Sequence, residues 1–284
     1  MSKRALILGL LVALVLALAA VACGGDDDDD ATGGETATET GTTAPSFSTL
    51  EDGVLTVGSD IPFPPFEFRE GGELTGFDIE LVEEIAGRLN LTTDFRDTAF
   101  DTIFTQLAAG RYDLVASATT ITPEREEQVN FTTPYYRAQQ SLTVNSERTP
   151  DIQSADDLGD GHSVAVQTGT TGEAWARENL APNGVEVRSF PEAPATYTAL
   201  EGGNVTGVIF DEPASIAEAE KRPSLEVVEV IDTDEDYGFA VDPQNEPLLD
   251  AVNEALQAMI DDGTYQQIYD KYFPDAPAGS VAGS

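Results

Sequence analysis

The sequence predicts an α/β fold with mainly parallel sheets. From Thr49 to Phe273, short runs rich in β-branched residues alternate with runs whose apolar residues recur at helical spacing. Turn residues such as glycine, proline and aspartate separate these runs. A stretch of about 225 residues is long enough for two modest lobes or one large domain.

The first 22 residues have the pattern of a signal peptide. Lys3 and Arg4 form a positive start, an apolar run extends from Ala5 to Ala22, and a small-residue cleavage site ends in Cys23. Cys23 is the only cysteine, so no intramolecular disulfide can form. The site resembles a bacterial lipobox, although Ala20 stands where leucine is commoner, and this predicts a lipid anchor at Cys23. Secretion with a free cysteine and an uncleaved membrane span stay open as alternatives.

The chain is strongly acidic, and its acids begin directly after the signal peptide. Residues 23–48 contain the run Asp26 to Asp30 and almost no apolar residue, which predicts a disordered tether; residues 274–284 are expected to form a disordered tail. The formal net charge is −38, from 52 acids against 14 bases. Such a field repels phosphate backbones, which excludes nucleic-acid binding. Either adaptation to a salty habitat or an ordinary acidic surface can account for this net charge.

The expected elements follow one another in regular order. Gly110 and Gly263 end two of the helices, and Thr122 with Pro123 supplies an N-cap and a first helical residue for the helix that carries Arg125. The residues between about 145 and 160 form a polar break. The expected strands are 54–57, 112–116, 163–166, 185–190, 205–210, 225–230 and 238–241, and the expected helices are 78–90, 101–109, 173–180, 193–200, 246–262 and 264–273.

Four segments carry a resemblance to a known family. They are residues 59–68 on a proline-stiffened loop, Gly76-Phe77-Asp78, residues 117–125, and the C-terminal run 262–273. Together they resemble the bacterial extracellular solute-binding proteins, family 3, which serve polar amino-acid ABC importers. The resemblance spans nearly the whole chain after the tether.

This resemblance implies a two-lobed periplasmic-binding-protein fold of type II. Lobe 1 would comprise residues 49–138 and 237–273, lobe 2 would comprise 139–236, and two crossover segments near 135–139 and 233–237 would join them. The implied function is capture of a polar amino acid outside the cytoplasm, without a cofactor or metal, and its delivery to a membrane permease. The protein would act as a monomer held to the membrane only by its lipid anchor.

The resemblance also implies where the ligand's α-groups bind. Arg125 would hold the carboxylate, helped by the backbone N–H of Thr171, and Asp211 would hold the ammonium with the Thr120 hydroxyl. Residues 167–172 form a loop between a strand and a helix, where backbone N–H groups favour anions; the loop lacks a Gly-Lys-Ser pattern. Without the resemblance, Arg125 could pair with neighbouring acids at the surface and Asp211 could be an N-cap. Ser117 and Ala118 complete the expected set.

The side-chain end of the site is assigned in the same way. Phe63 and Phe100 would form aromatic walls. Asp60 would meet the tip of the ligand, as in family members whose ligands carry an amide or cationic side chain, namely glutamine, lysine, arginine or histidine; a turn-forming aspartate is the alternative. Gln167 resembles arginine-type members, and Phe210 lacks a polar contact that some relatives have there.

Other function classes stay open. A few relatives of this fold act as periplasmic dehydratases on prephenate-like acids, which requires an acid placed for proton transfer. The lone histidine, His162, precedes a strand and is expected at the surface, and a sensor without transport would differ only in its partner. The acidic run 232–236 lacks the glycine and the bidentate acid of a calcium loop.

Overall fold

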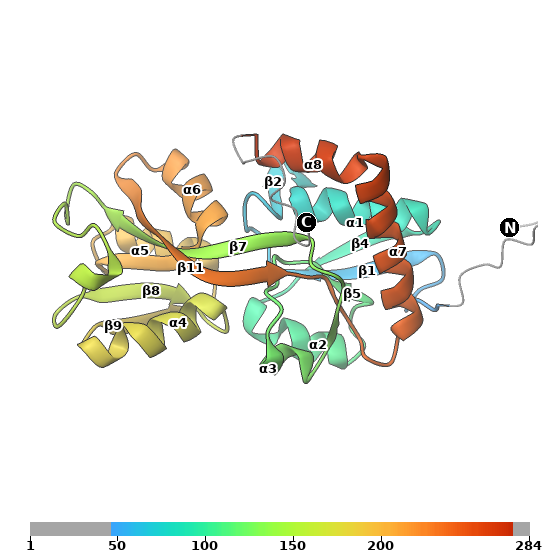
Figure 1. Cartoon of the computed structure of the whole chain (residues 1–284), viewed down its shortest axis with the longest axis horizontal. Coiled ribbons are helices and arrows are strands. Elements are labelled where there is room, and N and C mark those ends of the chain that lie inside the picture. Colours follow the sequence, from blue (N-terminus) through green and yellow to red (C-terminus); the bar gives the residue numbers. More distant parts are fainter. Residues whose placement is uncertain (1–46, 275–284) are drawn as a thin grey trace, which may run out of the picture. The chain divides into compact units, whose positions relative to one another are not determined.

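The computed structural model describes residues 47–274, and these contain two five-stranded sheets. The expected signal peptide, Cys23, most of the tether and all but the first residue of the expected tail lie outside the described residues. Figure 1 shows the two sheets with their helices. The strands are β1 (Val54–Ser59), β2 (Phe68–Glu70), β3 (Glu73–Thr75), β4 (Thr92–Asp97), β5 (Leu114–Val115), β6 (Asn130–Phe131), β7 (Tyr136–Asn145), β8 (Ser163–Gln167), β9 (Glu186–Phe190), β10 (Gly207–Asp211), β11 (Leu225–Tyr237) and β12 (Ala240–Val241).

The helices match the expected ones closely. Thr122 caps α3 by accepting a hydrogen bond from the Arg125 N–H, and Pro123 is its first residue, as expected. Gly263, at φ 82°, separates α7 from α8 in the left-handed region that favours glycine. The helices are α1 (Phe77–Arg88), α2 (Ile103–Ala108), α3 (Pro123–Glu126), α4 (Thr171–Asn179), α5 (Ala193–Glu201), α6 (Glu212–Lys221), α7 (Glu246–Asp262) and α8 (Thr264–Tyr272).

Both sheets are mixed, which corrects the expectation of mainly parallel sheets. The first sheet has the order β4-β1-β5-β12-β6. Strand β1 is parallel to its neighbours β4 and β5, whereas β12 is antiparallel to its neighbours β5 and β6. The second sheet has the order β11-β7-β10-β8-β9. Strand β8 is parallel to its neighbours β9 and β10, whereas β7 is antiparallel to its neighbours β10 and β11. The pair of β7 and β11 is antiparallel because the chain enters the second sheet along β7 and leaves it along β11.

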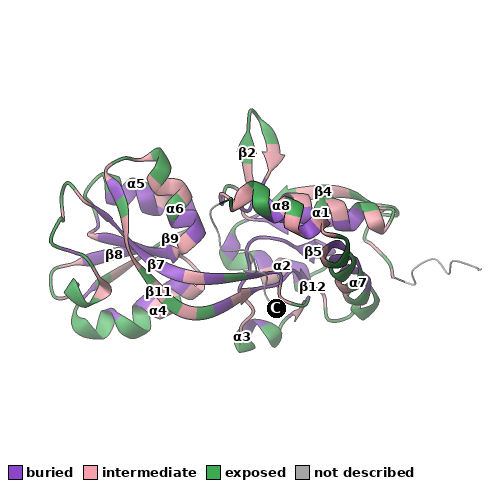
Figure 2. Ribbon diagram, turned by 45° about the horizontal axis from the view of Figure 1, so that its top comes forward, coloured by how far each residue is buried: buried purple, intermediate pink, exposed green. Residues whose placement is uncertain are grey.

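We call each sheet with its covering helices a lobe. Helices α1, α2 and α7 contact the first sheet, and α4, α5 and α6 contact the second. Figure 2 shows that the central strands are buried while the outward faces of α4 and α7 are exposed. On α1, apolar residues at helical spacing such as Ile79, Val82 and Ile85 are fully buried, whereas Leu89, which follows the last residue of the helix, is half-buried.

The sequence reasoning missed several strands. The hairpin of β2 and β3, the edge strand β4 and the long strand β7 were not expected, and β11 continues through the acidic run 232–236 to Tyr237. In Figure 1, β7 and β11 lie side by side and link the two sheets. Their pairing is antiparallel and irregular, with register shifts after Val227 and after Ile231.

Candidate binding site

The loop after β1 places the first two site residues. Asp60 follows directly on β1, and its backbone N–H donates to the Ser117 Oγ at 2.9 Å. The loop contains two cis peptide bonds, Ile61-Pro62 and Pro64-Pro65. Phe63 is buried, and its ring lies 5.9 Å from that of Phe66 and 5.5 Å from that of Phe210. The wall expected at Phe63 therefore includes a ring from the second lobe.

The segment after β5 is held from behind by two buried acids. The Ser117 hydroxyl donates to Glu67 Oε1 at 2.9 Å, and the Ala118 N–H donates to Asp78 Oδ2 at 2.9 Å. Ala118 has a φ of 47°, a conformation that is uncommon for a residue with a side chain. Burial raises the pKa of Asp78 to about 7 and that of Glu67 well above its ordinary value.

Arg125 is buried, which removes the alternative of an exposed surface pair. Its guanidinium donates to the carbonyl oxygens of Thr120 at 2.7 Å and Gly169 at 3.2 Å, the second belonging to the other lobe. It lies over the rings of Phe100 and Phe104, 5.3 and 5.0 Å from their centroids. Among the described residues, Arg125 forms no ion pair with a carboxylate.

Asp211 ends β10 and precedes α6, but its side chain makes no capping hydrogen bond. The side-chain amide of Gln140, on β7, donates to the Asp211 carboxylate instead. Burial raises the pKa of Asp211 to about 7, and the nearby Glu235 carboxylate adds to this shift. The alternative of a simple helix cap therefore does not account for this side chain.

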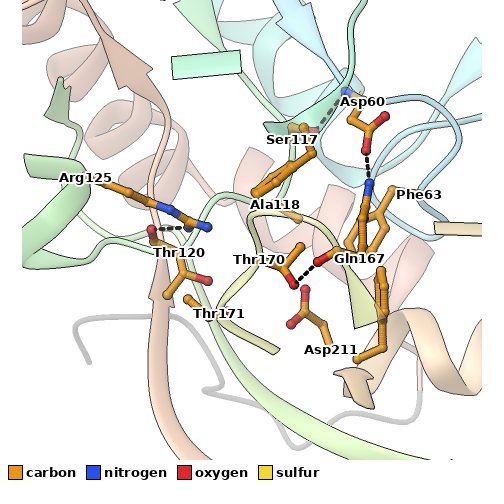
Figure 3. Close-up of a pocket in the computed structure, with 12 residues that line it drawn as sticks. Asp60, Phe63, Ser117, Ala118, Thr120, Arg125, Gln167, Thr170, Thr171 and Asp211 are labelled. Atoms are coloured by element: carbon orange, nitrogen blue, oxygen red, sulfur yellow. Dashed lines mark hydrogen bonds between the residues drawn. The ribbon is translucent and has the colours of Figure 1, made fainter. Parts of the chain in front are cut away.

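Asp60 contacts the second lobe directly. Gln167, at the end of β8, donates from Nε2 to Asp60 Oδ2 at 2.5 Å and to the Pro191 carbonyl oxygen at 3.3 Å. Burial raises the pKa of Asp60 to about 6; the Gln167 hydrogen bond opposes this shift, while nearby acids such as Asp97 and Glu192 reinforce it. Figure 3 shows Asp60 and Gln167 facing each other across the pocket.

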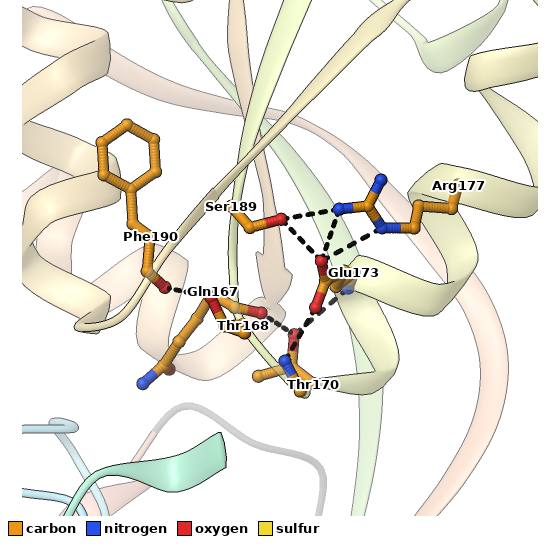
Figure 4. Close-up of polar contacts among 8 residues, drawn as sticks. Gln167, Thr168, Thr170, Glu173, Arg177, Ser189 and Phe190 are labelled. Atoms are coloured by element: carbon orange, nitrogen blue, oxygen red, sulfur yellow. Dashed lines mark hydrogen bonds and ion pairs between the residues drawn. The ribbon is translucent and has the colours of Figure 1, made fainter.

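The loop 167–172 is tied down by its own polar contacts (Figure 4). Glu173 Oε2 accepts the Gly169 N–H at 2.7 Å, and the Thr170 hydroxyl donates to the Gln167 carbonyl at 2.8 Å. The Gly169 N–H is therefore not available to an anion. The Thr171 N–H, at the first residue of α4, makes no hydrogen bond within residues 47–274, so this donor remains for an anion.

One pocket brings all ten expected residues together. It holds about 320 Å³ of space between atoms, part of which is open to solvent. Phe210 and Thr170 also line it. Phe210 was not placed in the binding site from the sequence, although its position beside Asp211 at the end of β10 indicates that it could line the pocket. The lining residues are Asp60, Phe63, Phe100, Ser117, Ala118, Thr120, Arg125, Gln167, Thr170, Thr171, Phe210 and Asp211.

Three further observations concern other chemistries. His162 is half-buried, lies outside the pocket lining, and accepts a hydrogen bond from the Gly159 N–H through Nδ1. Within residues 47–274, no three histidine, cysteine or acidic side chains are grouped so that they could hold a metal ion. None of the helices in that range is long and apolar enough to cross a membrane.

The chain was compared with known proteins. The model of the bacterial extracellular solute-binding proteins, family 3, matches residues 55–275. The L-cystine-binding protein TcyJ of Escherichia coli (strain K12) is 34% identical over 225 residues, which are 78% of this chain and 84% of that protein. The ABC transporter arginine-binding protein 1 of the same strain is 32% identical over 226 residues, 78% of this chain and 90% of that protein.

A solved structure extends the comparison to the fold. An ancestral arginine-binding protein bound to arginine superposes with a TM-score of 0.74 at 37% identity, covering 78% of this chain and 98% of that chain. All three proteins are named for binding an amino acid and none for a catalysed reaction. The chain has the two-lobed periplasmic-binding-protein fold of type II and belongs to the bacterial extracellular solute-binding proteins, family 3.

Proposed function

We propose that this extracytoplasmic protein captures a polar amino acid with a cationic or amide side chain between its two lobes and delivers it to the permease of an ABC importer. The observation that carries the proposal is the charge pattern of the pocket. The buried Arg125 guanidinium, which forms no ion pair within residues 47–274, lies among acids at two separate positions, Asp211 and Asp60. An α-carboxylate, an α-ammonium and a polar side-chain tip supply the three complementary groups.

The α-groups of the ligand would bind at the hinge side of the pocket. Arg125 has five N–H donors and uses two on carbonyl oxygens, so donors remain for a carboxylate, which the Thr171 N–H can also reach. Asp211 would then pair with the ammonium, because a buried carboxylate is unfavourable without a cation. Ser117, Ala118 and Thr120 supply further polar groups beside these two.

The side-chain tip would lie between Phe63 and Phe100 and reach Asp60 and Gln167. A cationic tip pairs with the Asp60 carboxylate, and an amide can hydrogen-bond to both side chains. An acidic tip meets the repulsion that already raises the pKa of Asp60, from Asp97 and Glu192 among others. Arginine, lysine, histidine and glutamine therefore fit, whereas glutamate and aspartate do not.

The dehydratase alternative fits this pocket less well. A prephenate-type acid has no ammonium, so it would leave the Asp211 carboxylate buried beside Glu235 without a cation. The relatives reported above are named as binding proteins, which also favours binding over catalysis. A sensory role would use the same pocket and differ only in the partner of the closed protein.

The remaining assignments rest on the sequence. We propose that Cys23 carries a lipid and that residues 23–48 form the tether between membrane and binding domain. We also propose the boundary between the lobes near 138–139 and 236–237, within the paired strands β7 and β11. Residues 49–138 with 237–273 would then form lobe 1 and residues 139–236 lobe 2.

A thermal-shift panel tests the proposed ligand class. A ligand that binds only the folded protein stabilises it by RT ln(1 + [L]/Kd), about 2.7 kcal/mol at 100 times Kd. For a domain of this size, that corresponds to about 5 to 10 °C. At least one of arginine, lysine, histidine and glutamine should raise the unfolding temperature by this amount. Stabilisation by glutamate alone would contradict the assignment of Asp60.

A further inference from the structure

The second crossover strand contains a bulge beside the binding pocket. Ile231 of β11 pairs with Gln140 of β7, and the next registered pair is Glu235 with Ala138. Three residues, 232–234, thus stand opposite the single residue 139, and Asp234 within the bulge has a φ of 50°. A bulge redirects the side chains that follow it. Here it brings the carboxylate of Glu235, which is only 7% exposed, to the boundary between the lobes.

The Glu235 carboxylate accepts hydrogen bonds from both lobes. Its Oε2 accepts from the Thr120 hydroxyl and from the Thr171 hydroxyl, each at 2.7 Å. Thr120 follows β5 of the first sheet, whereas Thr171 begins α4 over the second. Its Oε1 accepts from Thr233 Oγ1 at 2.8 Å and Gln140 Nε2 at 3.1 Å. This one acid therefore joins the two walls of the pocket.

These contacts determine what the Thr120 hydroxyl can offer a ligand. A hydroxyl has one hydrogen to donate and two lone pairs that accept. Because the Thr120 hydrogen is donated to Glu235, only acceptor capacity remains on the Oγ1 atom, and Thr120 lines the pocket. An ammonium can use this acceptor, while a carboxylate oxygen or a methyl group of a ligand cannot.

Glu235 also adds a second negative charge beside Asp211. The side-chain amide of Gln140 donates to both carboxylates, so the two acids are neighbours. Glu235 contributes to the raised pKa of Asp211, and neither acid forms an ion pair with a cation among residues 47–274. Two adjacent acids, Glu235 buried and Asp211 half-buried, favour a ligand that brings a positive charge to this end of the pocket.

We propose that Glu235 is a positioning residue that makes a free α-ammonium obligatory for binding. It acts by fixing the Thr120 hydroxyl as an acceptor and by doubling the negative charge beside Asp211. This inference rests on the proposed capture of an amino acid. It goes beyond that function because Glu235 does not itself line the pocket.

Calorimetric titration with matched ligands tests the proposal. Each pair differs only in the α-amino group: L-arginine with 5-guanidinopentanoate, and L-glutamine with 5-amino-5-oxopentanoate. Wild-type protein should bind the amino acid of at least one pair far more tightly than its des-amino partner. Glu235→Gln should weaken the amino acid by about tenfold or more and change the des-amino ligand less than about threefold. Glu226→Gln, an exposed acid on the same strand, is the matched control and should change neither.

A double-mutant cycle covers the case in which Glu235→Gln folds poorly. Thr120→Val removes the hydroxyl that Glu235 orients and should cause the same selective loss, and the two substitutions combined should be less than additive because they act through one hydrogen bond. If Glu235→Gln and Thr120→Val both keep the wild-type preference for the α-amino ligand, or weaken both ligands of a pair equally, the inference is wrong and the proposed function stands. If only lysine or histidine binds, the same comparison is made with that amino acid and its des-amino analogue. If wild-type protein binds none of arginine, lysine, histidine and glutamine, both are wrong.

Discussion

Replacing Arg125 with alanine is the most informative single substitution. The guanidinium is buried, uses two of its five N–H donors on the carbonyl oxygens of Thr120 and Gly169, and forms no ion pair among the described residues. Its remaining donors are the strongest carboxylate partner in the pocket. Removing one member of a buried, hydrogen-bonded charge pair costs about 2 to 5 kcal/mol. Arg125→Ala should therefore raise Kd by about 30-fold to several thousandfold.

Folding should be much less affected than binding. The substitution loses contacts with the rings of Phe100 and Phe104, but it also removes a buried cation that pairs with no carboxylate of residues 47–274. The two effects oppose each other, so the unfolding temperature of the ligand-free variant should change by less than about 5 °C. Arg111→Ala removes an exposed arginine of the same lobe and serves as control.

Calorimetry and thermal unfolding of both variants separate the two effects. We expect Arg125→Ala to lose binding with a near wild-type unfolding temperature and Arg111→Ala to keep both. Wild-type affinity in Arg125→Ala would refute the carboxylate assignment. A collapse of its unfolding temperature would show that Arg125 stabilises the fold.

Four further results are expected. Asp211→Asn should weaken every α-amino ligand, measured by calorimetry; a change in side-chain preference alone would contradict its assignment. Asp60→Asn should weaken arginine far more than glutamine, because an amide can still pair with an amide, and equal losses would oppose this. Cys23→Ser should move the protein from the membrane fraction into the soluble fraction, whereas unchanged retention would favour an uncleaved span. The ligand-free protein should unfold at a higher temperature at pH 5 than at pH 8. Burial raises the pKa of Asp60 to about 6 and the pKa of Asp211 to about 7, so the protonated carboxyl groups favour the folded state. This contribution to stability is lost as the pH rises from about 4 through these two pKa values. A flat or opposite profile between pH 5 and 8 would contradict it.

The local parts of the site could be predicted because short-range rules determine them. The N-cap at Thr122 with Pro123 places Arg125 at the third position of its helix, and the cap and helix lie where expected. Asp60 directly follows a buried strand and Asp211 is the last residue of another, the usual place for binding residues in an α/β fold. Family resemblance then selected these residues from many other polar side chains.

The hinge could not be predicted in the same way. Residues 135–139 were expected to form a crossover and no strand was expected over 136–145, because the pairing of β7 with β10 and β11 depends on partners about 60 to 100 residues away. The bulge in β11 lies in the run 232–236, which has no apolar residue, and register is only weakly specified where a strand is polar on both faces. Gln140 and Glu235 come into contact with the pocket-lining residues Asp211, Thr120 and Thr171 only through this pairing, so both were missed.

Calorimetric titration of ligand-stripped mature protein with each of the twenty amino acids tests the central claim most directly. The charge pattern of Arg125, Asp211 and Asp60 predicts saturable one-to-one binding of one or more of arginine, lysine, histidine and glutamine, with no binding of glutamate or aspartate. Absence of binding for all twenty, or tight binding confined to the acidic amino acids, would contradict it.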